Sequence, residues 1–280
     1  MAHLSTFPPG QSASCTADYG WACAVAAQAG VFARLDGRSF GGTYAEATRW
    51  LADHRAEASA LVAIFTRGDG METWLAQLPE ICPNLPIAGG AAARGNGCMH
   101  GETVPHAADV ALFAVTEGIW RSTALTAHRP VGGFFALSGS SPRQFDRIAG
   151  TNESLLEVLA RVRRENGLAP DDWDRIALTD RDGVVYHLHP EGEAIVSGAD
   201  LCASREVAPA VFNAAALDQA RAALHGNCLV FGCAGLAGLQ ESGLPWPGCG
   251  AFTALYGEIH PGAFVPRFSN LTLSILERES

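Results

Sequence analysis

The sequence predicts an α+β fold in which two related units, residues 1–128 and 129–280, each contribute a mixed β-sheet with flanking helices. In both halves, segments with helical periodicity are followed by short apolar runs of strand length. The two halves share a loose order of these elements, and glycine- or proline-containing turns separate them. Because ligand sites often form where structural units meet, we also expect a pocket between the two units.

The first half of the chain contains helical patterns separated by buried-strand patterns. Apolar residues recur at three- and four-residue spacing in the helical segments, and Gly42 precedes the second of them. The predicted helices cover residues 15–30, 43–55 and 71–78. The predicted strands cover residues 60–65, 85–92 and 109–115. These short, mainly apolar runs predict buried strands.

The second half begins where the pattern weakens, within residues 121–130, and we place the boundary after residue 128. The turn Asp180-Arg-Asp-Gly183 lies between two apolar runs and predicts a β-hairpin. Asn166-Gly167 predicts the end of a helix. The predicted helices cover residues 155–165 and 214–224. The predicted strands cover residues 133–137, 176–179, 184–188, 228–231, 251–259 and 271–276.

The charge of the chain excludes two classes of partner. The formal net charge is −10, whereas nucleic-acid binding needs a basic surface that displaces counterions. The only dense basic run, Arg161, Arg163 and Arg164, falls on a predicted amphipathic helix, and we interpret it as a solvated face. We therefore expect neither a nucleic acid nor an anionic membrane as a partner. The chain also contains no lysine, which excludes a lysine Schiff base and a Walker A loop.

The distribution of apolar and cysteine residues predicts a cytoplasmic protein. Residues 1–20 lack the charged start and apolar run of a signal peptide, and no apolar stretch reaches the roughly 18 residues of a membrane span. The eight cysteines are scattered, so we expect reduced thiols. Neither Cys-x-x-Cys nor His-Glu-x-x-His occurs, and we therefore predict no metal site.

Four motifs near the C-terminus occur in the order and spacing of a known family. They are Leu229-Val-Phe-Gly-Cys-Ala-Gly235, Gly248-Cys-Gly-Ala-Phe252, Tyr256-Gly-Glu-Ile-His-Pro261 and Phe268-Ser-Asn-Leu-Thr-Leu273. This part of the chain resembles the C-terminal unit of the FIST domain, and the region of residues 60–92 is similar to its N-terminal unit. One departure is that Ala234, Gly235 and Leu236 stand where the family commonly has asparagine, glycine and arginine.

The resemblance implies intracellular sensing of small ligands, proposed in the family to include amino acids. Some members are haem-binding nitric oxide sensors, so the resemblance also admits haem, for which the axial candidates are His106, His187 and His225. Because the chain carries no attached kinase, methyltransferase or cyclase module, the expected protein partner is a separately encoded signalling protein.

Cys233 and Glu258 are the candidate catalytic residues. Cys233 ends an apolar strand just before glycine, where a thiolate near an anion-binding turn would be nucleophilic. The alternative is a buried, inert thiol. Glu258 lies within an apolar strand, so its carboxylate either points to solvent or serves a pocket as an acid or base.

The candidate ligand-binding residues come from two loops and two strands. They are Gly90, Asn96, Ala234, Gly235, Tyr256 and Asn270. A tight turn is the alternative for the loop with Gly90 and Asn96, and Asn270 either bonds the ligand or holds a loop in place. His187 and His189 share one face of a strand, which suits a metal in spacing but is more typical of a polar outer face.

These features predict a cytoplasmic small-ligand-binding sensory protein of FIST type. The alternative function is a cysteine-centred hydrolase, lyase or isomerase that acts on a small, amino-acid-like metabolite.

Overall fold

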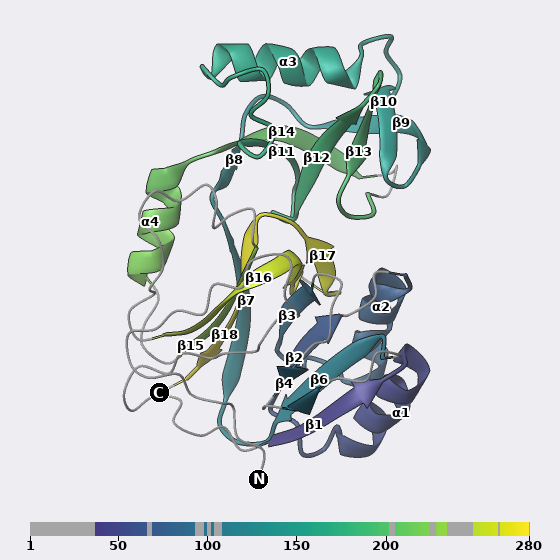
Figure 1. Ribbon diagram of the computed structural model, residues 1–280, viewed down its shortest axis with the longest axis vertical. Coiled ribbons are helices and arrows are strands. Elements are labelled where there is room, and N and C mark those ends of the chain that lie inside the picture. Colours follow the sequence, from purple (N-terminus) through teal and green to yellow (C-terminus); the bar gives the residue numbers. More distant parts are fainter. Residues whose placement is uncertain are drawn as a thin grey trace.

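The computed structural model of the 280-residue chain describes a sheet and a barrel stacked end to end (Figure 1). The described residues are 37–65, 69–92, 98–99, 102–103, 108–201, 205–223, 228–233, 249–262 and 264–279. The predicted helix at residues 15–30 lies outside them, as do Asn96, Ala234 and Gly235.

Four helices occur in the described ranges, and each was predicted from periodicity. They are α1 (Tyr44–His54), α2 (Met71–Ile81), α3 (Leu155–Glu165) and α4 (Ala214–Ala223). Helix α1 begins with a capping box, because the Thr43 side chain accepts from the Glu46 backbone while the Glu46 carboxylate accepts from the Thr43 backbone. Helix α2 buries Trp74, Leu75 and Leu78 on its inner face, which explains its apolar spacing.

The larger sheet takes strands from both ends of the chain. Its strands are β1 (Gly37–Gly42), β2 (Ala60–Phe65), β3 (Ile87–Ala92), β6 (Val110–Val115), β7 (Trp120–Thr126), β15 (Cys228–Cys233), β16 (Cys249–His260), β17 (Arg267–Ser269) and β18 (Thr272–Arg278). The order is β1-β6-β2-β3-β16-β15-β18-β7, with β17 paired to β16. The pairs β2–β3 and β15–β16 are parallel. We call this sheet, with α1 and α2, the sheet body.

The second sheet closes into a barrel. Its strands are β8 (His128–Pro130), β9 (Phe135–Ser141), β10 (Gln144–Ile148), β11 (Ile176–Asp180), β12 (Val185–Glu191), β13 (Ala194–Ser197) and β14 (Glu206–Phe212). The order β11-β12-β13-β10-β9-β14 returns to β11, which gives six strands in a ring, and β8 adds to β14. The short strands β4 (Cys98–Met99) and β5 (Glu102–Thr103) form a separate hairpin.

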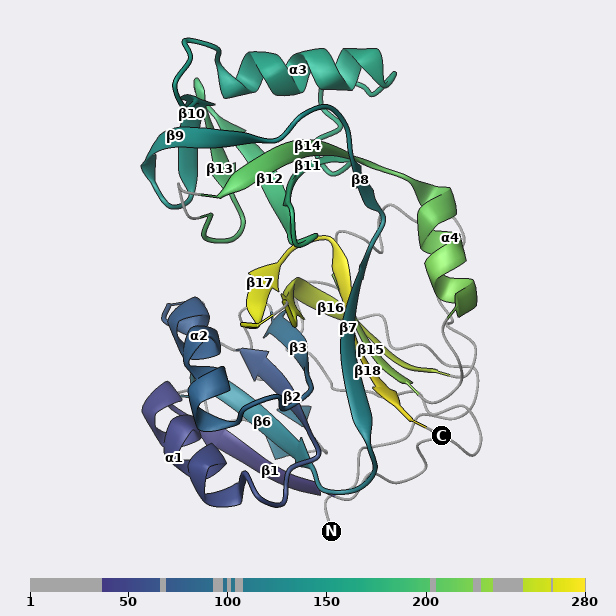
Figure 2. The ribbon, with the colours of Figure 1, turned by 180° about the vertical axis from the view of Figure 1, so that it is seen from behind.

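One apolar core connects the barrel to the sheet body. The same cluster contains Trp74 and Leu75 of α2, Leu178 and Tyr186 of the barrel, and Phe268 of β17. Helix α3 lies across the end of the barrel that faces away from the sheet, whereas α1 and α2 lie beside the N-terminal strands (Figures 1 and 2). Continuous apolar packing fixes the barrel against the sheet body and places β17 between them.

The predicted mixture of helices and mixed sheets is confirmed, but the closed barrel was not predicted. The chain crosses from the larger sheet to the barrel between β7 and β8, close to the predicted boundary after residue 128, and returns to the larger sheet at β15 (Figure 2). The assignment of residues 1–128 and 129–280 to two related units remains a prediction.

The interpretation of the arginine run on α3 was wrong for one residue. Arg163 is buried, because its guanidinium lies 4.1 Å from the centre of the Trp173 ring and donates to the Pro170 carbonyl. Arg161 and Arg164 are exposed, as a solvated face requires, and Arg161 pairs with Glu153.

Among the described helices, none is both long and apolar enough to cross a membrane.

Candidate functional site

Glu258 is a fully buried carboxyl in the middle of the larger sheet. Its Oε2 accepts hydrogen bonds from both the backbone N–H and the hydroxyl of Thr272, each at 3.1 Å. Burial raises the pKa of the Glu258 carboxyl well above its ordinary value, although the hydrogen bonds from Thr272 and Cys233 oppose that shift. The side chain therefore does not point to solvent, and its environment favours the protonated form.

Cys233 lies beside Glu258, so the structure brings the two candidate catalytic residues together. Cys233 ends β15 opposite Leu255 of the parallel strand β16, and its thiol hydrogen-bonds the Glu258 carboxyl. The side chain of Cys233 is nearly buried and belongs to an apolar cluster. A buried thiol in an apolar cluster is typical of an inert cysteine, which was the alternative interpretation of Cys233. A reactive cysteine is usually more exposed.

Two of the candidate ligand-binding residues lie near Glu258. They are Gly90, on the neighbouring strand, and Asn270, close to Gly257. Gly90 of β3 is the register partner of Glu258 in β16. Tyr256 lies on β16 two residues before Glu258.

Asn270 holds the barrel against the sheet body. Its Oδ1 accepts from the His187 backbone at 3.2 Å, and its own N–H donates to the Val185 carbonyl at 2.7 Å. A Cβ at Gly257 would lie 2.1 Å from the Phe268 ring and 3.0 Å from Asn270 Nδ2, so glycine is required in the Tyr256-Gly-Glu motif. These contacts match the alternative in which Asn270 secures a chain segment.

A cavity of about 680 Å³ lies between the barrel and the sheet body. Residues of the barrel line one part of it, and residues of α2 and of the segment 264–268 line the rest. Its lining is Glu72, Ala76, Pro142, Asp182, Tyr186, Asp200, Arg205, Phe264, Val265, Pro266, Arg267 and Phe268. Cys233, Glu258 and Asn270 are not among these residues, so the predicted site residues and this cavity are separate features of the molecule.

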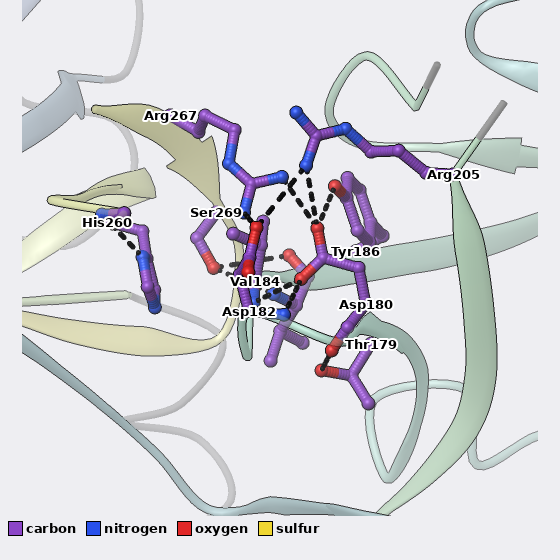
Figure 3. A network of polar contacts seen from close by, with 11 residues as sticks. Thr179, Asp180, Asp182, Val184, Tyr186, Arg205, His260, Arg267 and Ser269 are labelled. Carbon is purple, nitrogen blue, oxygen red and sulfur yellow. Dashed lines mark hydrogen bonds and ion pairs between the residues drawn. The ribbon is translucent and has the colours of Figure 1, made fainter. Parts of the chain in front are cut away.

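One wall of the cavity is a charged network around the buried Asp180 (Figure 3). Asp180 Oδ1 accepts from the backbone N–H groups of Asp182 and Val184, as expected for the turn of the β11–β12 hairpin. Asp180 Oδ2 accepts from Arg267 at 2.7 Å and from Arg205 at 3.2 Å. Arg267 is a sheet residue and also binds Asp182 at 2.7 Å, so the network crosses from the sheet body to the barrel.

Glu72 of α2 also lines the cavity, and its surroundings raise the pKa of its carboxyl. Glu72 Oε1 accepts from the Asp200 backbone at 2.8 Å and lies 3.5 Å from Arg143, which also pairs with Asp200. Burial is the main cause that raises the pKa of Glu72 to about 7, and the negative charge of Asp200 adds to it. Glu72 is therefore the described cavity group best placed to exchange a proton at physiological pH.

The paired histidines lie on the barrel, away from this cavity. The rings of His187 and His189 pack with centres 4.3 Å apart, and His187 Nε2 lies 2.8 Å from Asp174. Burial lowers the pKa of His187, which favours its neutral form. No cluster suited to a metal ion occurs within the described residues. The other haem candidates, His106 and His225, lie outside those residues.

Comparison with known proteins adds no assignment to this geometry. No model of a protein family matches the chain, and no curated protein matches it at a significant level. The FIST resemblance therefore remains a prediction.

Sequence reasoning missed the cavity residues Glu72, Arg205 and Arg267. They come from three distant segments with ordinary local settings: Glu72 is in the first turn of α2, Arg205 immediately precedes β14, and Arg267 is the first residue of β17. One signal was available, because the turn Asp180-Arg-Asp-Gly183 places two carboxylates close together in a chain with only 17% charged residues. Carboxylates in such a turn need cationic partners if the turn becomes buried.

Proposed function

We propose that the chain is a FIST-type small-ligand-binding protein whose ligand, a small organic anion with an apolar part, occupies the cavity between the barrel and the sheet body. The cavity volume of about 680 Å³ falls within the roughly 300–1,000 Å³ typical of small-molecule pockets. The parallel pairs β2–β3 and β15–β16, one from each half of the chain, support two related units, and a cytoplasmic location suits the free thiols of Cys82, Cys228 and Cys233.

Arg205 carries this proposal. Its side chain is 38% exposed in the cavity wall, and its contacts with Asp180 and Asp182 are all made by Nη1 (Figure 3). Within the described residues this leaves Nε and Nη2 as donors toward the cavity. A guanidinium with two adjacent donors binds carboxylate or phosphate oxygens in a bidentate manner.

The remaining lining favours a ligand that also has an apolar group. Phe264, Val265 and Phe268 contribute the apolar side, and Phe264 is 91% exposed. A large exposed aromatic side chain gains stability when a ligand covers it. Asp182 and Asp200 are already paired with arginines, so they repel an incoming anion less than free carboxylates would.

Native mass spectrometry of the purified chain tests the proposal. We expect the wild type to retain a small-molecule mass and Arg205→Met to lose it. Arg181→Met is the matched control, because Arg181 pairs with Glu206 on the exposed surface and is not part of the cavity lining. Equal retention by wild type and Arg205→Met, or no retained mass in the wild type, would contradict the proposal.

The contact between Cys233 and Glu258 favours a second candidate, a cysteine-centred enzyme. In that mechanism the ionised fraction of Glu258 accepts the Cys233 thiol proton, and the thiolate bonds to a substrate carbonyl carbon while the carbonyl π bond breaks and its electron pair moves to oxygen. A carboxyl with a raised pKa is a better base than an ordinary one. Rapid alkylation of Cys233 by iodoacetamide at pH 7, slowed by Glu258→Gln, would support this enzyme; a rate below that of a model thiol favours the binding protein.

A further inference from the structure

Residues 267–272 form a continuous path from the cavity to Glu258. Arg267 and Phe268 line the cavity at one end of this segment. At the other end, Thr272 supplies both hydrogen bonds to Glu258 Oε2. The six residues include β17 and the start of β18, so one short piece of backbone contacts both features that the site analysis found to be separate.

The middle of the segment is bound to the barrel. The Val185 N–H donates to Ser269 Oγ at 3.0 Å, and the His187 N–H donates to Asn270 Oδ1 at 3.2 Å. Ser269 and Asn270 are both buried, and the Asn270 N–H donates to the Val185 carbonyl. Strand β12 is therefore joined to this segment by one backbone hydrogen bond and by bonds to the Ser269 and Asn270 side chains, and a shift of the barrel must move the segment or break them.

The backbone between Asn270 and Thr272 makes a sharp change of direction. Leu271 has a φ of 51°, in the left-handed region that side-chain-bearing residues seldom adopt, and it is buried. This conformation separates β17, which pairs with β16, from β18, which pairs with β15 and β7. A buried residue in such a conformation is held there by its surroundings, so the segment has little freedom to absorb a displacement.

We infer that the segment Arg267–Thr272 couples the position of the barrel, and hence the occupancy of the cavity, to the hydrogen bonding of Glu258 and its contact with Cys233. Its role in sensing rests on the proposed function. An anion bound by Nε and Nη2 of Arg205 lies on the guanidinium whose Nη1 contacts Asp180 and Asp182, so its charge repels these two carboxylates, which also hold Arg267. Occupancy of the cavity therefore changes the contacts at one end of the segment, and Thr272 carries that change to Glu258.

Amide hydrogen exchange of the ligand-free protein tests the coupling from the barrel side. Asp180→Asn keeps an oxygen for the backbone N–H groups of Asp182 and Val184, but it places a donor opposite Arg205 and Arg267. We expect the Thr272 amide to exchange about tenfold faster, within the range of typical coupling between sites. Asp182→Asn is a milder second variant if Asp180→Asn does not fold, and Glu206→Gln is the control for loss of an exposed pair.

The reverse direction must give a matching result, because coupling between equilibria is reciprocal. In Glu258→Ala we expect the exchange rates of the Val185 and His187 amides, which bond to the segment, to rise above their wild-type values. The increase should be smaller at Tyr186, which lies between them. No change at Thr272, or an equal increase across all amides of the larger sheet, would overturn the coupling. If the coupling fails while a ligand is retained, only this inference is lost; if the coupling holds and no ligand binds, only the proposed function is lost.

Discussion

Glu258 and Glu72 are two carboxyls whose pKa is raised mainly by burial, yet they lie in different kinds of environment. Glu258 is enclosed by strands, and both of its Thr272 hydrogen bonds come from the same sheet. Glu72 lies on the cavity wall and receives its hydrogen bond from the barrel, across the interface. The comparison teaches that a raised pKa alone does not locate a binding site. The carboxyl must also border a cavity that can hold a ligand, as Glu72 does and Glu258 does not.

The largest effect is expected from Glu258→Ala. The substitution leaves the Thr272 N–H and hydroxyl without an acceptor and opens a void, so we expect the free energy of unfolding to fall by about 3–5 kcal/mol. Glu258→Gln keeps the volume and an oxygen acceptor and should cost less than about 1 kcal/mol at pH 7. Chemical denaturation of both variants measures the difference. Equal stability of the alanine and glutamine variants would show that the carboxyl is not enclosed as described.

A smaller, pH-dependent effect is expected from Glu72→Gln. The folded-state pKa of about 7 exceeds the ordinary value of 4.5, so the wild type gains stability from this group below pH 4.5 and loses it as the pH rises to 7. The lost amount is on the order of 3 kcal/mol. We expect the unfolding free energy of the wild type, relative to Glu72→Gln, to decrease between pH 4.5 and 8. A difference that does not change with pH would place Glu72 in a more solvated position.

The smallest effect on stability is expected from Arg205→Met. Arg205 is partly exposed, and Arg267 also neutralises Asp180, so we expect a loss of less than about 1 kcal/mol. Thermal unfolding compares it with Arg181→Met, which breaks an exposed pair. A loss much larger than that of the control would make Arg205 a structural residue rather than a ligand-binding one, and the contrast between the two regions would disappear.

The sequence predicted the buried strands and amphipathic helices well because burial leaves a local pattern. Strand β2 is apolar at every position, and α3 has clear periodicity, and both were placed at their observed bounds. Strand β7 was missed because its sequence, Trp120-Arg-Ser-Thr-Ala-Leu-Thr126, mixes polar and apolar residues at a sheet edge. Strand β14 contains Pro209, which argues locally against a strand.

Closure of the barrel and the composition of the cavity depend on contacts between distant segments. The pairing of β11 with β14 closes the ring, and no local pattern specifies it. The sequence analysis expected Cys233 and Glu258 to meet at a shared pocket; they are in contact, but neither lines the cavity, and this outcome depends on strand packing that no local pattern specifies. Arg205 has no distinctive neighbours in sequence, so its role emerges only when the barrel is placed against the sheet body.

Titration with benzoate, a small organic anion with an apolar ring, tests most directly whether the cavity binds such a ligand. In NMR spectra at pH 6 we expect saturable shifts at the amides of Glu72, Asp200 and Arg267, abolished by Arg205→Met and retained in Arg181→Met. Because Glu72 is mostly protonated at pH 6 and mostly ionised at pH 8, binding should weaken severalfold at pH 8 in the wild type and much less in Glu72→Gln. Absence of saturable shifts, or shifts that Arg205→Met leaves unchanged, would contradict ligand binding in this cavity.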